Sequence, residues 1–183
     1  MIKVKISYKS LMQLFHPCDE DFVKNVCNGY CCHSGSRNAH IVINESDIPK
    51  LRKYRPDIVV QEGILQTGKL CLFKDKNGLC ILHNTPDYPF GCRISPFTLN
   101  KNNTLIIRNR WRLLKCFKIK EGKIPAYKVF RESLVAIFRE LEAQQIIDFI
   151  EKNKCDLYSN VSEEIHQKIK EKNDALHKSY LSP

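Results

Sequence analysis

Cysteines are the residues in this chain whose type and spacing point most directly to chemistry. The chain has 183 residues and nine cysteines. Eight lie in the first two thirds of the sequence: Cys18, Cys27, Cys31, Cys32, Cys71, Cys80, Cys92 and Cys116. The total of nine cysteines is odd, two of them are adjacent, and no secretory signal pattern opens the sequence, so metal binding is favoured over a disulfide framework.

The first cysteine motif is Cys27-Asn-Gly-Tyr-Cys31-Cys32, which places three thiols within six residues around a glycine. Closely spaced thiolates on a turn can bind one ion at about 2.3 Å, and glycine allows the positive φ that such a turn needs. Adjacent cysteines do not easily bind the same tetrahedral ion. Two separate centres and one multi-iron cluster therefore both stay open.

The second motif is Cys71-x8-Cys80-Ile-Leu-His83, followed by Cys92. Cys80 and His83 have a C-x-x-H spacing, in which both side chains can reach one ion. The eight cysteines together with His83 can fill two four-coordinate sites, holding either iron–sulfur clusters, with 4Fe-4S favoured, or zinc. His33 and His40 are weaker candidates, and Cys155 is expected to be a thiol that binds no metal.

The segments CNGYCC, LCLFKDKNGLCILHNTPDYPFGCRISPF and KCFKIKEGKIPAY resemble the YkgJ-type cysteine-cluster family, described as a zinc- or iron-chelating domain. The likeness covers Cys27 to Tyr127. It implies metal-ligand roles for seven cysteines. Cys31 and Cys32 match the family's double cysteine and Cys27 the one before it, Cys71 and Cys80 match the middle pair, Cys92 lies in the C-R-x-x-P-F element, and Cys116 matches the last cysteine.

The resemblance has two departures and one distant extension. Cys27 stands one residue further from the double cysteine than the family pattern has it, and eight residues instead of two separate Cys18 from Cys27. Cys18 is kept as a candidate ligand that a longer loop would deliver. A related branch is similar to flagellin lysine N-methylases, but this chain lacks their larger size, so that activity is not expected here.

The net charge of +10 favours an anionic partner, although a lysine-rich surface alone also explains it. Leu105–Phe117 is predicted to be a strand, on which Arg108, Arg110 and Arg112 would share a face with Cys116. These arginines, with Arg93 beside Cys92, are candidates for binding a substrate anion or nucleic acid. A solvated outer face of the sheet is the alternative.

The hydrophobic pattern predicts an α+β fold in one compact domain: a small cysteine-rich, metal-organised body with short antiparallel strands at 1–125, and a helical hairpin packed on it at 126–183. A strand is predicted at 2–6, another at His40–Asn44, and two more at Leu70–Phe73 and Cys80–Leu82, joined by the turn 76–78. Helices are predicted from Pro125 to Asn153 and from Ser162 to Tyr180.

Three functions follow from these features, for a protein expected in the cytoplasm and without a membrane span. The favoured one is an iron–sulfur or iron protein that carries out redox or group-transfer chemistry on a peptide or small molecule. A structural-zinc module that binds nucleic acid is the second, and a non-catalytic metal carrier or sensor is the third. The residues do not decide whether a reaction occurs.

Overall fold

The computed structural model describes residues 1–32, 41–66 and 70–181, without the side chains of Cys32 and of residues 175–181. It is a mixture of helices and short strands, which confirms the coarse α+β prediction. The chain forms two compact units, each made from two stretches of sequence, and this division differs from the predicted one at residue 125. Unit 1 contains Met1–Pro17 and Arg93–Lys170; unit 2 contains Cys18–Cys92 and Glu171–Pro183.

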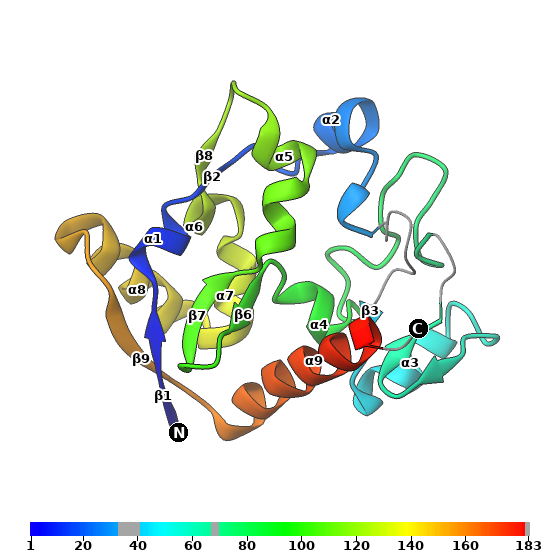
Figure 1. The fold of residues 1–183 in the computed structure, drawn as a ribbon. Coiled ribbons are helices and arrows are strands. Elements are labelled where there is room, and N and C mark those ends of the chain that lie inside the picture. The colour runs from blue at the N-terminus through cyan, green and yellow to red at the C-terminus, as the bar shows by residue number, and fades with distance from the viewer. Residues whose placement is uncertain (33–40, 67–69, 182–183) are drawn as a thin grey trace. The chain divides into compact units, whose positions relative to one another are not determined.

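Unit 1 is built on a four-stranded sheet in the order β6-β7-β1-β9 (Figure 1). β1 pairs in parallel with β7 and antiparallel with β9, while β6 and β7 pair antiparallel. Val4 and Ile6 of β1 are buried, as the predicted alternation of this strand requires. The strand bounds are Ile2–Ile6 for β1, Phe97–Leu99 for β6, Thr104–Ile107 for β7 and Leu157–Val161 for β9.

The other elements of unit 1 are a two-stranded ribbon and several helices. The ribbon pairs β2, Leu14–Phe15, with β8, Ile124–Pro125. The helices are α1, Tyr8–Leu11; the 3₁₀ segment Asn109–Leu113; α5, Lys115–Lys118; α6, Ala126–Val129; α7, Arg131–Phe138; α8, Glu140–Asn153; and the first half of α9, Glu163–Leu181.

The long helix predicted from Pro125 to Asn153 is interrupted twice, at Phe130 and at Arg139. Phe130 has φ −112° and ψ 34°, outside the helical region, and its ring packs edge-on against Phe15, Phe97 and Trp111. Arg139 has φ 68°, which ends one helix and redirects the chain into the next. The predicted segment is therefore helical, but it forms three helices instead of one. Packing of the Phe130 ring causes the first break, and the positive φ of Arg139 causes the second.

The predicted helical hairpin is wrong, because β9 lies between α8 and α9 and joins the sheet beside β1. The predicted second helix is present as α9. Ser162, one of two serines that the sequence offered as a cap, caps this helix, since its Oγ accepts a hydrogen bond from the Ile165 amide at 3.2 Å.

Unit 2 consists of short elements joined by turns. Its three-stranded sheet has the order β3-β5-β4, with two residues in each strand. The bounds are α2, Glu20–Phe22; a π-helical turn, Val23–Cys27; a 3₁₀ turn, Tyr30–Cys32; β3, Ile41–Val42; a 3₁₀ turn, Glu45–Asp47; α3, Ile48–Arg52; β4, Val60–Gln61; β5, Ile64–Leu65; and α4, Phe90–Arg93.

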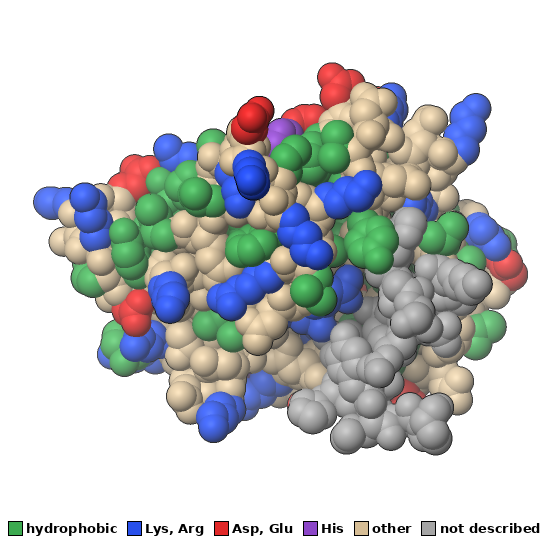
Figure 2. Space-filling view, turned by 45° about the horizontal axis from the view of Figure 1, so that its top comes forward, with side chains coloured by type: hydrophobic (Ala, Val, Ile, Leu, Met, Phe, Trp, Pro, Cys, Tyr) green, Lys and Arg blue, Asp and Glu red, His purple; other side chains and the backbone are tan. Residues whose placement is uncertain are grey.

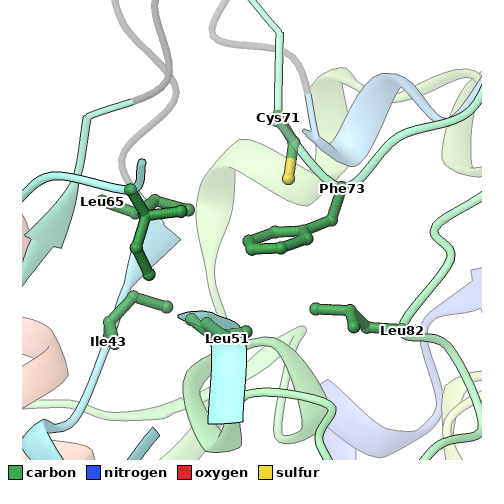
Figure 3. Packing of buried hydrophobic residues seen from close by; sticks show 7 residues of the cluster. Ile43, Leu51, Leu65, Cys71, Phe73 and Leu82 are labelled. Atoms are coloured by element: carbon green, nitrogen blue, oxygen red, sulfur yellow. The ribbon is translucent and has the colours of Figure 1, made fainter. Parts of the chain in front are cut away.

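The core of unit 2 is small and contains a cysteine (Figure 3). Cys71 lies next to Phe73 in the figure, and its thiol is 8% exposed. Seven buried side chains form the cluster: Ile43, Leu51, Ile58, Leu65, Cys71, Phe73 and Leu82. Burial of a large apolar side chain contributes about 1.5–3 kcal/mol, so this cluster supplies little stability to spare against the entropy of ordering so many loops.

Candidate metal centre

Cys71 and Cys80 are brought together by the turn that separates them. Asp75 closes this turn, because its Oδ1 accepts hydrogen bonds from the amides of Asn77 at 2.9 Å and Leu79 at 2.8 Å. Lys74 and Cys80 then form an antiparallel bridge. The predicted turn at 76–78 is confirmed, but in the described residues 70–82 isolated bridge residues stand where the sequence predicted two paired strands.

The sulfurs of this loop receive backbone amides. A hydrogen bond from the Phe73 amide favours the ionised form of Cys71, and the amides of Leu82 and His83 do the same for Cys80. Burial acts more strongly in the opposite direction: it raises the pKa of Cys71 to about 11, and it also raises the pKa of Cys80. Both thiols are therefore protonated at neutral pH in the absence of metal. The backbone amides that bond their sulfurs would stabilise the thiolates if a metal cation displaced the protons.

A second loop, at residues 27–31, meets this turn backbone to backbone. Asn28 and Gly29 follow the π-helical turn with φ values of 48° and 56°. A Cβ on Gly29 would lie 2.3 Å from the Gly78 carbonyl oxygen, and a Cβ on Gly78 would lie 2.3 Å from Asn28 Oδ1. Only glycine fits at both positions, and this contact holds Cys27 and Cys31 close to the turn before Cys80.

The third cysteine-bearing element is α4, which carries Cys92. The Phe90 amide donates to a carboxylate oxygen of buried Asp47 at 3.2 Å. A Cβ on Gly91 would lie 2.6 Å from the Val42 carbonyl oxygen, so this helix is pressed against β3. The ammonium of Lys172 donates to the Gly91 carbonyl at 2.6 Å from the other direction.

Four thiols from these three elements influence one another. Burial is the main cause that raises the pKa of half-buried Cys92, and negative charge on Cys71, Cys80 or Cys31 raises it further, while Lys172 opposes them. Cys31 also raises the pKa of both Cys71 and Cys80. Negative charge on one of these thiols therefore opposes ionisation of Cys71, Cys80 and Cys92.

The arrangement falls short of finished metal-coordination geometry. Among the side chains that the structure describes, no three from His, Cys, Asp or Glu are grouped closely enough to hold an ion. The Cys32 side chain and both His33 and His40 lie outside the described residues. The donor chemistry of the cysteines suits thiophilic metals.

The remaining sequence-predicted ligands with described side chains are Cys18, Cys27, Cys116 and His83. Cys18 is exposed just before α2, and Cys27 is half-buried at the end of the π-helical turn. Cys116 is buried in unit 1, where its carbonyl accepts a hydrogen bond from the His16 amide at 2.8 Å. His83 is exposed, and its ring packs edge-on against Tyr88 with centroids 5.4 Å apart.

The predicted arginine stripe is wrong, because the strand ends at Ile107 and a 3₁₀ helix follows. Residues two apart in a 3₁₀ helix do not share a face, so Arg110 and Arg112 diverge. The turn buries Trp111, whose ring packs against Phe130 with centroids 5.5 Å apart.

Two further observations bear on the proposed anion site. Arg112 Nε donates to Gln13 Oε1 at 3.4 Å, and Arg93 is exposed at the end of α4. Figure 2 shows Lys and Arg side chains spread over one face with apolar side chains between them. The positive charge is therefore dispersed on this face. The predicted surface shared by the arginines and Cys116 required a continuous strand, and the strand ends at Ile107.

Sequence reasoning missed the residues that hold the loops. Gly29, Gly78 and Gly91 make close backbone contacts that no motif announces. Lys172 is 4% exposed. It continues the three- and four-residue spacing of Ile165 and Ile169, so a lysine in an apolar helical position was the available signal.

Comparison with known proteins adds no identification: no family model, curated protein or solved structure matches the chain. The resemblance to the YkgJ-type family stays a prediction that rests on the quoted cysteine motifs. None of the helices in the described parts of the chain has both the length and the apolar character for crossing a bilayer.

Proposed function

We propose that unit 2 is a metal-binding module in which Cys31, Cys71, Cys80 and Cys92 are the protein ligands of one thiolate-rich centre. The observation that carries this proposal is the contact between two cysteine loops, since Gly29 packs against the Gly78 backbone in the turn that joins Cys71 to Cys80. The effect of the charge of Cys31, Cys71 and Cys80 on the pKa of Cys92 supports adding that residue. A set of cysteine thiolates is typical of iron–sulfur clusters and of zinc. Cys27, four residues before Cys31, and Cys32, directly after it, are further candidate ligands of the same centre.

The proposed cofactor is an iron–sulfur cluster, with 4Fe-4S favoured over zinc. The backbone amides directed at Cys71 and Cys80 support this choice, since hydrogen bonds to the ligand sulfurs tune the potential of such clusters. The resemblance to an iron- or zinc-chelating family is the second support. When bound, a cluster would supply electron transfer or Lewis-acid chemistry for the redox or group-transfer modification of a peptide or small molecule.

The chain's own part in this chemistry is to hold the ligands in place. The glycine contact joins the loops of Cys31 and Cys80, and Asp47 fixes the start of the helix that carries Cys92. Burial of Cys71 in the small core keeps water away from one side of the centre. Exclusion of solvent is one of the factors that set a cluster's potential.

The test is elemental analysis of protein produced and purified without oxygen, with iron, zinc and acid-labile sulfide measured together. Iron and sulfide in equal amounts, with visible absorption and a matching Mössbauer spectrum, are expected for the wild type. Replacement of Cys71, Cys80 or Cys92 by alanine is expected to abolish loading, whereas Cys155→Ala should load normally because Cys155 is exposed outside unit 2. Bound zinc without iron would contradict the proposed iron–sulfur redox function. The absence of any bound metal would contradict the metal-binding proposal as a whole.

The same analysis on Cys116→Ala tests the ligand role that the sequence predicted for this residue. Full loading of that variant is expected if the four thiols of unit 2 suffice. Loss of metal in a variant that still folds would show that the ligand set proposed here is incomplete.

A further inference from the structure

A lysine lies buried beside the proposed centre. Lys172 is in the part of α9 that belongs to unit 2, and it is 4% exposed. Its Nζ donates a hydrogen bond to the Gly91 carbonyl at 2.6 Å, and Gly91 directly precedes Cys92. The residue before it in α9, Glu171, accepts a hydrogen bond from the Asn44 side chain at 3.3 Å.

Burial of an ammonium group costs several kcal/mol, and a well-packed apolar side chain is often as stable or more stable at such a position. A lysine on the apolar face of a helix is therefore poorly explained by stability alone. Its charge is held close to a proposed ligand along the chain, since the carbonyl that it binds belongs to the residue directly before Cys92.

The environment leaves the Gly91 carbonyl little freedom to move. A Cβ at Gly91 would meet the Val42 carbonyl oxygen at 2.6 Å, so the backbone is in close contact with β3 on one side. The Phe90 amide is held by Asp47. The ammonium therefore lies at a fixed place next to the ligand cysteine.

We propose that Lys172 is a positioning residue of the metal centre, whose ammonium balances the excess negative charge of the ligand thiolates and orients the loop of Cys92. This inference rests on the proposed function. Four thiolates outweigh the positive charge of a zinc ion or of an oxidised 4Fe-4S core, so the loaded centre is anionic. Partners outside the ligand shell typically contribute about 10–100-fold to metal affinity.

The experiment uses Co²⁺ as a spectroscopic probe of the anaerobic full-length protein, with affinity measured by competition against a chelator. Lys172→Met removes the charge with a similar volume, Lys172→Arg keeps it, and Lys170→Met removes an exposed charge from the same helix as the matched control. Urea unfolding of each metal-free variant is measured in parallel, which separates a loss of folding from a loss of binding.

Lys172→Met is expected to bind Co²⁺ at least about 10-fold more weakly, while Lys172→Arg and Lys170→Met stay close to wild type. Its thiolate-to-cobalt charge-transfer band should move to lower energy, because a sulfur without a nearby cation gives up an electron more easily. A purely structural lysine would not shift that band. A folded Lys172→Met variant with wild-type affinity and spectrum would overturn this inference alone.

Two further outcomes are also decisive. If Lys172→Met does not fold, Lys172→Arg with an unshifted band and wild-type affinity supports the charge role, and Lys172→Gln with an unshifted band contradicts it. A wild-type protein that shows no charge-transfer band with Co²⁺ would remove the proposed function itself, which distinguishes the two failures.

Discussion

The two units of this chain reach their structures by different means. Unit 1 has a four-stranded sheet, helices of up to 14 residues wholly within it, and a core built around Phe130. Unit 2 has two-residue strands, a seven-residue core cluster and loops in direct backbone contact. Regular hydrogen bonding and apolar burial suffice for the first. The second depends on tight local packing and, in the proposal made above, on a bound metal.

Metal removal is expected to have the largest effect and to act on unit 2. A ligand that binds only the folded state at about a thousand times its Kd stabilises that state by about 4 kcal/mol. Anaerobic chelation should therefore open the amides of β5 and of the turn at 75–79 to hydrogen exchange. The amides of β1 and β7 should keep their protection. Equal loss of protection in both units would show that the difference between them is not thermodynamic.

Substitution at the glycine contact is expected to come next. Gly78→Ala places a methyl group 2.3 Å from Asn28 Oδ1 at a residue with φ 85°, and about 3 kcal/mol of stability or more should be lost in chemical denaturation. Gly63→Ala is the matched control. Gly63 also has positive φ, 73°, but the methyl group would meet only the Ile43 carbonyl oxygen at 3.7 Å, so about 1 kcal/mol is expected.

The glycine pair also has a functional readout. Gly78→Ala should lower the bound metal along with the stability, since it separates the loops of Cys31 and Cys80. Gly63→Ala should keep its metal. Equal loss of metal from both variants would indicate that strain at any positive-φ glycine of unit 2 is enough to release the metal. The contact between Gly29 and Gly78 would then have no special role in metal binding.

The stability of the metal-free protein is expected to fall at high pH because of Cys71, which lies in unit 2. The folded state raises the pKa of Cys71 from 9.0 to about 11, so it binds the proton more tightly than the unfolded state does. The resulting stability is fully present below about pH 9 and is lost as pH rises through about 11. Each tenfold difference in proton affinity is worth about 1.4 kcal/mol, so the loss approaches about 3 kcal/mol. Cys71→Ala should flatten this part of the stability profile, and an unchanged slope would contradict the assignment.

The smallest effect is expected from Tyr127→Phe in unit 1. The Tyr127 hydroxyl donates to Glu151 Oε1 at 2.7 Å, and its loss should lower the free energy of unfolding by about 1 kcal/mol. Metal content should stay at the wild-type level. A change in metal content from this variant would show that the two units are coupled.

The sequence predicted local elements well where a single segment carries the signal. The strand at 2–6 needs only its alternation, and Ser162 needs only its place before an apolar helical run, so both were predictable. β9 was not predicted, because its partner β1 lies more than 150 residues away and its five residues, LYSNV, are too short and mixed a pattern to indicate a strand. Distant pairing of this kind leaves no local trace.

The candidate site divides in the same way. Residue type and spacing predicted thiol clustering, and the middle pair around the turn at 76–78 followed from turn chemistry. The grouping of Cys31 with Cys71, Cys80 and Cys92 depends on backbone contacts at Gly29 and Gly91, which a single sequence does not reveal. The arginine stripe failed because burial of Trp111 overrode strand continuation at Arg108.

The position of β1 within its sheet has a consequence for the order of assembly on the ribosome. β1 is synthesised before both of its neighbours, β7 and β9, which come from the second half of the printed sequence. A nascent chain therefore exposes Cys31, Cys71, Cys80 and Cys92 while the first strand still waits for its partners. Lys172 is translated after all four of these cysteines, so any metal captured before that point meets the thiols before it meets the lysine.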